Sequence, residues 1–393
     1  MENYDRLLRA VQLSSDDAAV VVDARWEPVG GAGTRIYPPT FPPDAVDPDR
    51  KRPYIVEPRL VDGQREDTVV VDQPPSQSNR IEEVVGHAVR TGRLSLAHLL
   101  LEHELSNGRT VRVSSFTAPH RFADAYWRDS VVDGVTFDKS RVGKQLRAAT
   151  VENCAALYER EPFSLLLGSW DSHRKGRPAR FPRVYRSEMF GVAPEFGRRA
   201  AGRMDPHNLI GAVQNPEKAT DGTGGWEHVV PEGRAAKAER LSTIGHGNIA
   251  PVLSHGGVTV REVRRLASLS MAGLARLQFG DAPPAAADAA RVALAALALL
   301  GDRLAFAGPG LWLRSGCELV LVSETVVWHQ RGGRTEPLEL DPPGTFALFE
   351  HARNQAAEQG LPMSAEVVRL SAGKGLAKAL NHAYLASDPE EGQ

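Results

Sequence analysis

Hydrophobic and polar positions change along the chain in short runs, and these runs predict strands and helices mixed in no regular order. Four runs rich in Val and Leu predict β-strands, because such side chains suit a pleated, half-buried surface. The predicted strands span residues 18–24, 68–71, 110–114 and 317–328. Because they do not alternate with helices in a βαβα rhythm, the pattern favours an α+β fold over a doubly wound sheet or a barrel.

Helical periodicity and capping residues predict four helices. We expect Ser76 to be the N-cap of a helix in SQSNRIEEVVGHAV, and Ser140 to be the N-cap of a helix over residues 140–159. Residues 285–300 are mostly Ala and Leu, which predicts a helix buried on nearly all sides. A helical tail is expected from Gly344.

Two stretches are expected to be insertions in a single elaborated domain over residues 1–393. Residues 30–67 contain most of the glycine-rich string VGGAGTR and a segment rich in Pro and Asp. Residues 215–250 are polar and rich in Gly, Lys and Glu, which is typical of a mobile loop or a projecting hairpin. No repeat of about 20–50 residues is present, which argues against a solenoid or a propeller.

Composition indicates a folded globular protein, since 42% of the residues are hydrophobic and 24% are charged. Two cysteines, Cys154 and Cys317, are too few for a disulfide scaffold and suit a reducing compartment. The N-terminal segment lacks the basic and apolar regions of a secretory signal. The longest apolar run, residues 292–300, is about half of the ~18 residues that a membrane span needs. We therefore expect a cytoplasmic protein with no membrane partner.

Charge is distributed unevenly along a chain whose formal net charge is −2. Residues 112–203 carry a net charge of +7, whereas residues 1–111 carry −5 and residues 204–393 carry −4. Nine Lys or Arg residues and only two Glu residues lie between Arg174 and Arg203. Such a cluster, interleaved with aromatic residues, favours a polyanion-binding surface over a merely solvated loop.

Most signatures of catalysis are absent from the sequence. No phosphate-binding loop pattern occurs, and VGGAGTR lacks the spacing of a dinucleotide fingerprint. The string GSWDSH, at residues 168–173, brings Ser, Asp and His together, but triad partners usually lie far apart in sequence. His98 and His103 are five apart, not four as in a helical zinc pair. The chain therefore has the character of a binding protein.

Several long strings in the chain carry a family resemblance. DQPPSQSNRIEE, at residues 72–83, is close to an S-Q-A-N-R-x-E tract, with Ser78 where Ala is usual. PHRFADAYWRDSVVDGVTF, at residues 119–137, resembles an H-R-x-x-D-A-x-x-R-D-S segment, with Tyr126 and Trp127 in place of smaller or aliphatic residues. Further similar strings follow at residues 165–173, 181–192, 202–206, 245–260, 285–300 and 313–320. Together they resemble the RAMP-superfamily backbone subunit (Cas-seven family) of type I-G, formerly I-U, CRISPR surveillance complexes.

The resemblance implies a non-catalytic subunit that binds crRNA, the guide RNA of such a complex. It implies an RRM-like (ferredoxin-like) α+β core with large insertions, including a thumb-like hairpin for which residues 30–67 and 215–250 are both candidates. Copies of the chain would assemble head to tail along the guide and present it to a target DNA strand. The other expected partners are a large subunit and a fused cap/guide-processing subunit, and no catalytic residue, metal or cofactor is expected.

A subunit that accepts any guide sequence must bind phosphate and ribose, which carry no sequence information. Arg, Lys, Ser and Asn suit that task, and aromatic or His rings can stack on a base. The candidate RNA-binding residues are Arg35, Ser76, Gln77, Asn79, Arg80, His120, Arg121, Arg128, Lys139, Arg141, Lys144, Trp170, His173, Arg174, Arg203 and Arg314.

Local context supports most of these candidates. Arg35 follows glycines that let an RNA backbone approach closely, and Ser76 to Arg80 stand at a helix entrance that favours a phosphate. Arg121 and Arg128 share one face if residues 120–130 are helical. Lys139, Arg141 and Lys144 surround the start of the next helix, and Trp170, His173 and Arg174 can clamp a nucleotide. Arg203 and Arg314 are carried over from the family-like strings.

Each candidate also has a structural interpretation. SQSNR can be an ordinary helix cap with a solvated arginine, and Trp170 can be a core residue. Asp124 and Asp129 can neutralise Arg121 and Arg128 in ion pairs. The three basic residues at 139–144 can be a solvated helix face.

Two other functions remain open at this point. Related backbone subunits of type III complexes cut target RNA with a loop aspartate and a metal, a role that Asp129, Asp133 or Asp138 can fill. The chain can also be a free-standing single-strand RNA-binding protein.

Overall fold

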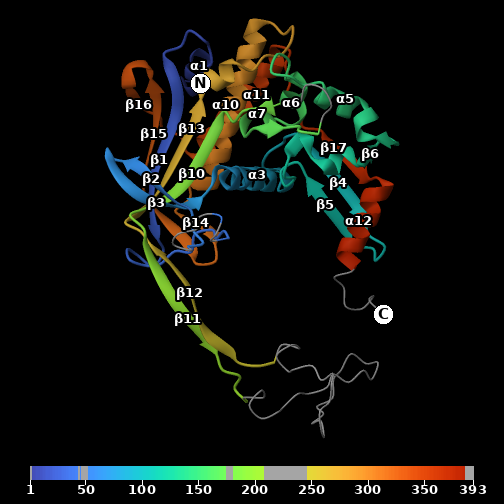
Figure 1. Cartoon of the computed structure of the whole chain (residues 1–393). Helices are drawn as coiled ribbons and strands as arrows, with labels where there is room; N and C mark the ends of the chain where they lie inside the picture. Colours follow the sequence, from blue (N-terminus) through green and yellow to red (C-terminus); the bar gives the residue numbers. More distant parts are fainter. Residues whose placement is uncertain (1, 43–44, 46–51, 174–179, 208–245, 386–393) are drawn as a thin grey trace.

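The computed structural model of the chain describes residues 2–42, 45, 52–173, 180–207 and 246–385. A large antiparallel sheet forms one side of the molecule (Figure 1). Its strands lie in the order β14-β15-β1-β13-β10-β3-β2, and β16 pairs with β15. The strands are β1 (Asp17–Pro28), β2 (Val56–Val61), β3 (Gln64–Asp72), β10 (Tyr185–Val192), β13 (Glu262–Ser270), β14 (Gly310–Arg314), β15 (Cys317–Gln330) and β16 (Thr335–Pro337). The predicted strands over 18–24, 68–71 and 317–328 are confirmed as parts of β1, β3 and β15.

Helices cover one face of this sheet. The covering helices are α1 (Glu2–Ala10), α3 (Pro74–Arg90), α9 (Met271–Ala275), α10 (Pro284–Phe306) and α11 (Pro342–Glu358). Along β1, Val20, Val22, Ala24 and Trp26 are buried at every second position, as the period of a strand requires. The Ala- and Leu-rich helix α10 is buried on nearly every side, which confirms the prediction for residues 285–300.

The chain passes through the centre of the sheet in the order β1, α3, β10, β13, α10, β15. The four strands of this series lie side by side as β15-β1-β13-β10, and each neighbouring pair is antiparallel. Both helices of the series pack against each other on the covered face of the sheet. The result is a β-α-β-β-α-β unit, which agrees with the α+β fold class expected from the sequence.

A buried polar network ties α10 to the sheet. Arg265 on β13 is fully buried, and its guanidinium bonds the Asp302 carboxylate and, at 2.8 Å, the Tyr185 hydroxyl. Asp302 also pairs with Arg303, whose Nη2 donates to Glu324 on β15 at 3.0 Å. Because a buried charge is costly unless it is paired, these contacts fix the register between the helix and three strands.

A second, five-stranded sheet lies beyond α3 (Figure 1). Its strand order is β5-β4-β17-β6-β7, and β4 and β17 are parallel although they come from distant parts of the chain. The strands are β4 (His98–Glu104), β5 (Thr110–Ser114), β6 (Ser130–Val132), β7 (Val135–Thr136) and β17 (Val367–Ala372), and α12 (Lys374–Leu385) follows. The predicted strand over 110–114 is confirmed as β5.

Short elements connect the two sheets. They are η1 (Arg121–Ala123), α4 (Ala125–Arg128), η2 (Phe137–Lys139), α5 (Arg141–Arg147), α6 (Ala155–Arg160), α7 (Phe163–Leu166), β8 (Ser169–Trp170) and β9 (Arg180–Phe181), while η3 (Arg331–Gly333) lies between β15 and β16. Ser140 caps α5 as predicted, since its hydroxyl accepts from the Gly143 N–H at 3.0 Å.

Two local predictions were wrong, and one condition on which a candidate pair depended is not met. The helix expected over 140–159 is divided into α5 and α6, because Thr150 and Asn153 close a turn on each other and Cys154 N–H donates to Gln278 O at 2.9 Å. The condition concerned Arg121 and Arg128, which share one face only if residues 120–130 are helical. These residues form η1 and α4 with a break at Asp124, so they are not one helix.

The second wrong prediction concerns the start of α3. The helix begins at Pro74 and its N-cap is Gln73, so Ser76 lies inside the first turn. Two successive prolines at the first helical positions move the start upstream, because the missing N–H of Pro is harmless there and its fixed φ suits a helix.

An arm of two antiparallel strands, β11 (Glu195–Arg203) and β12 (Ile249–Thr259), projects away from the body between β10 and β13 (Figure 1). Backbone bonds between Ile36 and Val258, at 2.9 and 2.8 Å, fix the base of the arm to the loop after β1. Of the predicted insertion at 215–250, residues 215–245 lie outside the described residues. The insertion at 30–67 contains β2 and the start of β3. No helix among the described residues is long and apolar enough to cross a membrane.

Candidate nucleic-acid interface

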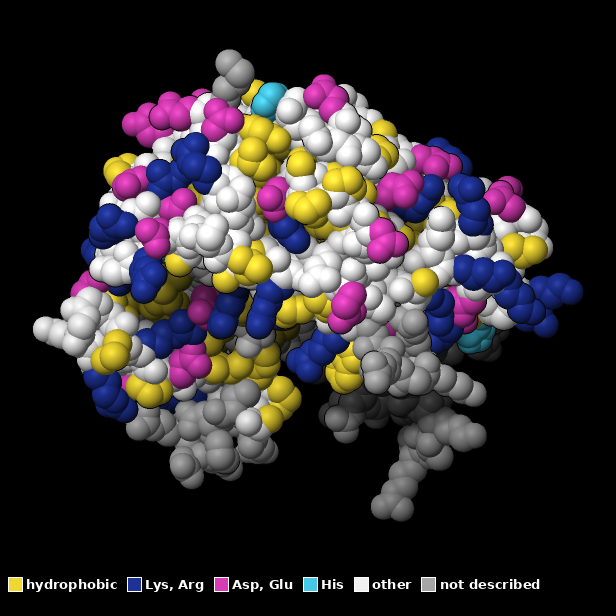
Figure 2. All heavy atoms as spheres, turned by 90° about the horizontal axis from the view of Figure 1, so that it is seen from above, with side chains coloured by type: hydrophobic (Ala, Val, Ile, Leu, Met, Phe, Trp, Pro, Cys, Tyr) yellow, Lys and Arg dark blue, Asp and Glu magenta, His cyan; other side chains and the backbone are white. Residues whose placement is uncertain are grey.

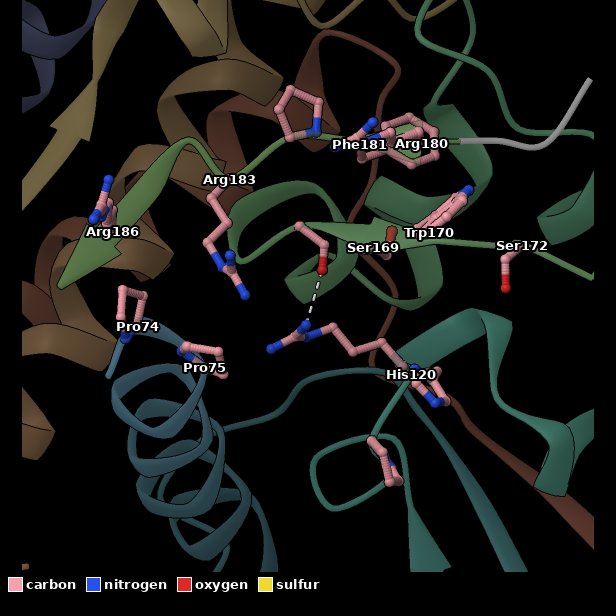
Figure 3. A pocket seen from close by; sticks show the side chains of 14 residues that line it. Pro74, Pro75, His120, Ser169, Trp170, Ser172, Arg180, Phe181, Arg183 and Arg186 are labelled. Carbon is pink, nitrogen blue, oxygen red and sulfur yellow. Dashed lines mark hydrogen bonds between the residues drawn. The ribbon is translucent and has the colours of Figure 1, made fainter. Parts of the chain in front are cut away.

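A cavity of about 930 Å³ opens where the N-terminus of α3, η1 and the β8–β9 pair meet (Figure 3). None of the 14 lining residues is acidic, and four of them are arginines. We call this hollow the arginine cavity. Its lining residues are Pro74, Pro75, Pro119, His120, Arg121, Gly168, Ser169, Trp170, Ser172, Arg180, Phe181, Pro182, Arg183 and Arg186.

Arg121 forms part of the cavity wall and is held from three directions. Its Nε and Nη2 donate to the Glu82 carboxylate at 2.6 and 2.8 Å, and its Nη1 donates to Gly168 O at 2.8 Å. The Trp127 indole N–H donates to the carbonyl of Arg121. Arg121 has a φ of +51°, a left-handed conformation that is uncommon for a residue with a side chain. Such strain persists only where the surroundings fix it, and it is concentrated at functional sites.

The structure thus answers one question left open by the sequence. Arg121 is not neutralised by Asp124, which instead caps α4 by accepting from the Tyr126 N–H at 3.0 Å. Its partner is Glu82, on α3, and both side chains are buried. Burial raises the pKa of Glu82, although Arg121 acts in the opposite direction.

Gly168 and Arg183 form the opposite wall of the cavity. Gly168 has a φ of +82°, and a Cβ at this position would lie 2.9 Å from Cγ of Arg183. The absence of a side chain therefore lets the stem of Arg183 pass over Gly168 while the Gly168 carbonyl holds Arg121. In Figure 3 the Arg183 side chain extends into the hollow, toward the end of α3 at Pro75.

The other two arginines stand at the rim. The guanidinium of Arg180 lies 5.7 Å from the ring centroid of Trp170, within the range of a cation–π contact. Arg186 Nη2 donates to the Glu188 carboxylate at 3.3 Å, and both Arg180 and Arg186 are exposed. Trp170 is 58% exposed, so it is not a core residue, and an indole ring beside the cavity can stack on a base.

The positively charged side chains of Arg121, Arg183 and Arg186 lie near one another in the arginine cavity. Burial lowers the pKa of Arg183, and the nearby charges of Arg121 and Arg186 lower it further. A site in which positive charges meet without an acidic lining residue favours an anion. By contrast, basic and acidic side chains are interspersed on the face of the molecule seen in Figure 2.

The two histidines predicted as RNA-binding lie at or near this site. His120 lines the cavity and is exposed, and its backbone N–H donates to Asp124 at 2.9 Å. His173 is also exposed, with its Nδ1 3.3 Å from the Ser172 hydroxyl. Arg174, the third member of the predicted clamp, lies outside the described residues.

Four other predicted residues converge on a single buried carboxylate, that of Asp72 at the end of β3. Ser76 Oγ donates to it at 2.8 Å, Gln77 Nε2 at 2.6 Å and Arg80 Nε at 2.8 Å. Arg314 Nη2 adds a bond at 3.2 Å and also donates to Val71 O at 3.0 Å. The structure thus brings Ser76, Gln77, Arg80 and Arg314 together at Asp72, where they join α3 to β3 and β14.

The remaining candidates are dispersed over the surface. Asn79 is exposed on α3, and Arg128 pairs with Asp129 at 3.2 Å, as the structural interpretation held. Arg35 is exposed at the base of the arm, where its Nη1 donates to the carbonyls of Arg198 and Gly256. The other exposed candidates are Lys139, Arg141 and Lys144 around the start of α5, and Arg203 at the end of β11.

Sequence reasoning missed three of the cavity arginines, Arg180, Arg183 and Arg186. The signal was present, because all three belong to the basic cluster between Arg174 and Arg203 and recur at every third residue. Local pattern alone does not show that this segment faces η1 and the start of α3.

The aspartates considered for a nuclease lie in the region between α4 and α5. Asp129 pairs with Arg128, Asp138 pairs with Arg147 at 2.6 Å, and Asp133 is exposed in a turn. In the part of the chain that the structure describes, no three His, Cys, Asp or Glu side chains form a group that could hold a metal ion.

Comparison with known proteins identifies one matching family model. Residues 20–194 match the family described as CRISPR-associated protein GSU0053 (Cas_GSU0053). This segment is similar to a CRISPR-associated family. It covers just under half of the chain, and it includes the motifs at 72–83 and 119–137 as well as every residue that lines the arginine cavity. The family match therefore supports the CRISPR-associated part of the resemblance for that segment.

The other two comparisons add little. No curated protein matches the sequence. A solved chain from an assembly titled "CRISPR RNA-guided surveillance complex, pre-nicking" aligns over 93% of this chain and 99% of its own length, with 11% identity and a TM-score of 0.30. A TM-score this low does not establish a common fold.

Proposed function

We propose that this protein is a crRNA-binding backbone subunit of a type I CRISPR surveillance complex, of the I-G (formerly I-U) subtype. The observation that carries the proposal is the arginine cavity, which lies wholly inside the segment that matches a CRISPR-associated family. Its donors are arginines, serines and a histidine, which suit phosphate and ribose and carry no preference for base sequence. A guide subunit needs such a surface because it must accept every spacer.

The arrangement of the core supports the same proposal. The series β1, α3, β10, β13, α10, β15, with its strands in the order β15-β1-β13-β10, supports the proposal that the core is an RRM-like (ferredoxin-like) unit. The arm β11–β12 projects between the second and third strands of this unit, and we propose it as the thumb-like hairpin. Its exposed apolar residues Ile249, Val252 and Leu253 suit a wedge between nucleotides or a contact with a neighbour.

In the proposed assembly, copies of the chain bind head to tail along one guide in the cytoplasm. A head-to-tail interface is heterologous, so it extends as an open helix and does not close by symmetry. The guide would be presented to a target DNA strand beside a large subunit and a fused cap/guide-processing subunit. The chain itself would hold RNA and not cut it.

Co-purification with the neighbouring CRISPR subunits, followed by sequencing of bound RNA, tests this proposal. We expect guides of uniform spacer length, protected along their whole length. Incubation of the purified complex with Mg²⁺ and complementary RNA is expected to leave that RNA intact. Heterogeneous cellular RNA, or none, would contradict the backbone role. Cutting of the complementary RNA that is lost in an Asp138→Ala variant would instead support the nuclease alternative.

A further inference from the structure

The four arginines of the arginine cavity differ in what already binds them. Arg121 is paired with Glu82, Arg186 bonds Glu188, and Arg180 lies against the Trp170 ring. Arg183 is the exception, because within the described part of the chain no hydrogen bond or ion pair involves its guanidinium, and its charged neighbours are Arg121 and Arg186. Arg183 is exposed, so its guanidinium is accessible to an anion that enters the cavity.

The residues around Arg183 fix the position of its side chain. The stem of Arg183 packs over Gly168, where even a methyl group would come within 2.9 Å of Cγ. Gly168 is also the residue whose carbonyl accepts from Arg121 Nη1 at 2.8 Å. One glycine thus sets the positions of two arginines, and its φ of +82° is a conformation that other residues adopt only at a cost.

We infer that Arg183 is the principal phosphate-binding residue of the arginine cavity, and that Gly168 is the residue that positions it. The ligand class is the phosphodiester of a single-stranded nucleic acid. This inference rests on the proposed function, and it names Arg183 as the residue that binds the phosphate of the RNA. Arg183 can present two N–H groups to one phosphate, a geometry that lysine does not reproduce.

The test is equilibrium binding of a fluorescent single-stranded RNA of mixed sequence to the full-length protein, measured over a range of salt concentrations. The Arg183→Ala variant is expected to bind about tenfold more weakly. The slope of log affinity against log salt is expected to fall by about 0.7, the value for one phosphate contact on a single strand. Arg183→Lys keeps the charge, so its slope should stay near that of the wild type while its affinity falls.

Arg112→Ala is the matched control, because Arg112 is an exposed arginine on β5 that is paired with Glu102. It is expected to bind RNA as the wild type does. Gly168→Ala is expected to weaken binding as much as Arg183→Ala does. Its thermal unfolding is measured in parallel, and the Arg183 variants decide the test if this variant does not fold.

The outcomes separate the inference from the function on which it rests. If the wild type binds RNA and Arg183→Ala matches it in affinity and slope, the assignment of Arg183 is wrong and the RNA-binding function stands. Weaker binding with an unchanged slope would also overturn the assignment, since no phosphate contact would have been lost. If the wild type itself does not bind RNA, the proposed function fails and the inference fails with it.

Discussion

Arg121, in the wall of the arginine cavity, lies near two buried carboxyl groups, those of Glu82 and Glu161. Glu82 forms the ion pair with Arg121, while Glu161 accepts hydrogen bonds from the backbone N–H and the hydroxyl of Ser164. Burial raises the pKa of Glu161 to about 8. Burial therefore favours the protonated form of Glu161 at neutral pH.

Stability should respond to pH through this group. The folded-state pKa of Glu161, about 8, lies above its ordinary value of 4.5, so the folded state retains a proton that the unfolded state releases. The stabilisation is fully present below about pH 4.5 and is lost as the pH rises to about 8. We expect Glu161→Gln to unfold with a weaker dependence on pH between 5 and 8, measured as the free energy of unfolding in urea.

Glu102→Gln is the control for this measurement, since Glu102 is an acid at the surface whose pKa is lowered by Arg112 and not raised. Its pH profile over the same range should follow that of the wild type. If Glu161→Gln also follows the wild type, Glu161 is ionised in the folded protein, and its carboxylate is a second buried negative charge near Arg121.

At the scale of the elements, the arm β11–β12 depends on contacts at its base for its order. A two-stranded ribbon is marginally stable by itself, so its order must come from the body of the protein. Tyr54 stacks on Phe196 with ring centroids 6.0 Å apart, and the Arg52 guanidinium lies 4.1 Å from the Phe196 ring. Arg35 bonds a backbone carbonyl on each of the two strands, at 3.3 and 3.4 Å. We interpret these contacts as an anchor.

Removing Arg35 should loosen the arm without unfolding the protein. In Arg35→Ala, we expect faster hydrogen exchange in residues 195–203 and 249–259, because both strands lose a bond to the body. The central strands β1 and β13 should exchange as in the wild type. Arg25→Ala, which removes an exposed arginine from β1, serves as the control and should leave the arm unchanged. Unchanged exchange of the arm in Arg35→Ala would show that the anchor lies elsewhere.

Elements with strong local signals could be predicted from the sequence. The Val-rich runs of β1, β3, β5 and β15 and the Ala-rich run of α10 lie where their patterns indicated. The predicted start of α3 was wrong. Serine is a residue type that often caps helices, which favoured Ser76, but the two prolines before Ser76 set the start of the helix at Pro74. In each case the outcome depended on residues within one turn of the element.

The candidate site could be predicted only in part, because it is assembled from distant segments. Arg121 and Trp170 were found from local motifs, yet the partner of Arg121 is Glu82, 39 residues away. Arg80 and Arg314 belong to separate motifs far apart in sequence, and only the fold brings both to Asp72. No local pattern distinguishes an arginine that closes a structural network from one that faces a cavity.

At the scale of the whole molecule, the largest cluster of buried side chains among the described residues spans both sheets, and two smaller clusters lie apart from it. A single cluster of buried side chains includes Val20 and Val22 of β1, Leu99 of β4 and Leu370 of β17. Strand β17 comes near the end of the chain and pairs in parallel with β4, so the second sheet requires segments that are far apart in sequence. The single domain that the sequence predicts over residues 1–393 stays a prediction, and this shared cluster provides a way to test it.

A shared core predicts one cooperative unfolding transition. Leu370 is 3% exposed, and Leu370→Ala should cost about 2–5 kcal/mol of unfolding free energy through lost burial and the cavity left behind. Because the core is continuous, the whole transition should move together when urea unfolding is followed by tryptophan fluorescence and by far-ultraviolet circular dichroism. Leu60→Ala, at a side chain that is 80% exposed, should change stability by less than about 0.5 kcal/mol. Two separate transitions, with Leu370→Ala moving only one of them, would mean that the sheets are independent domains. The arginine cavity would then lie where two domains meet, and its geometry would depend on how they are held in the assembled complex.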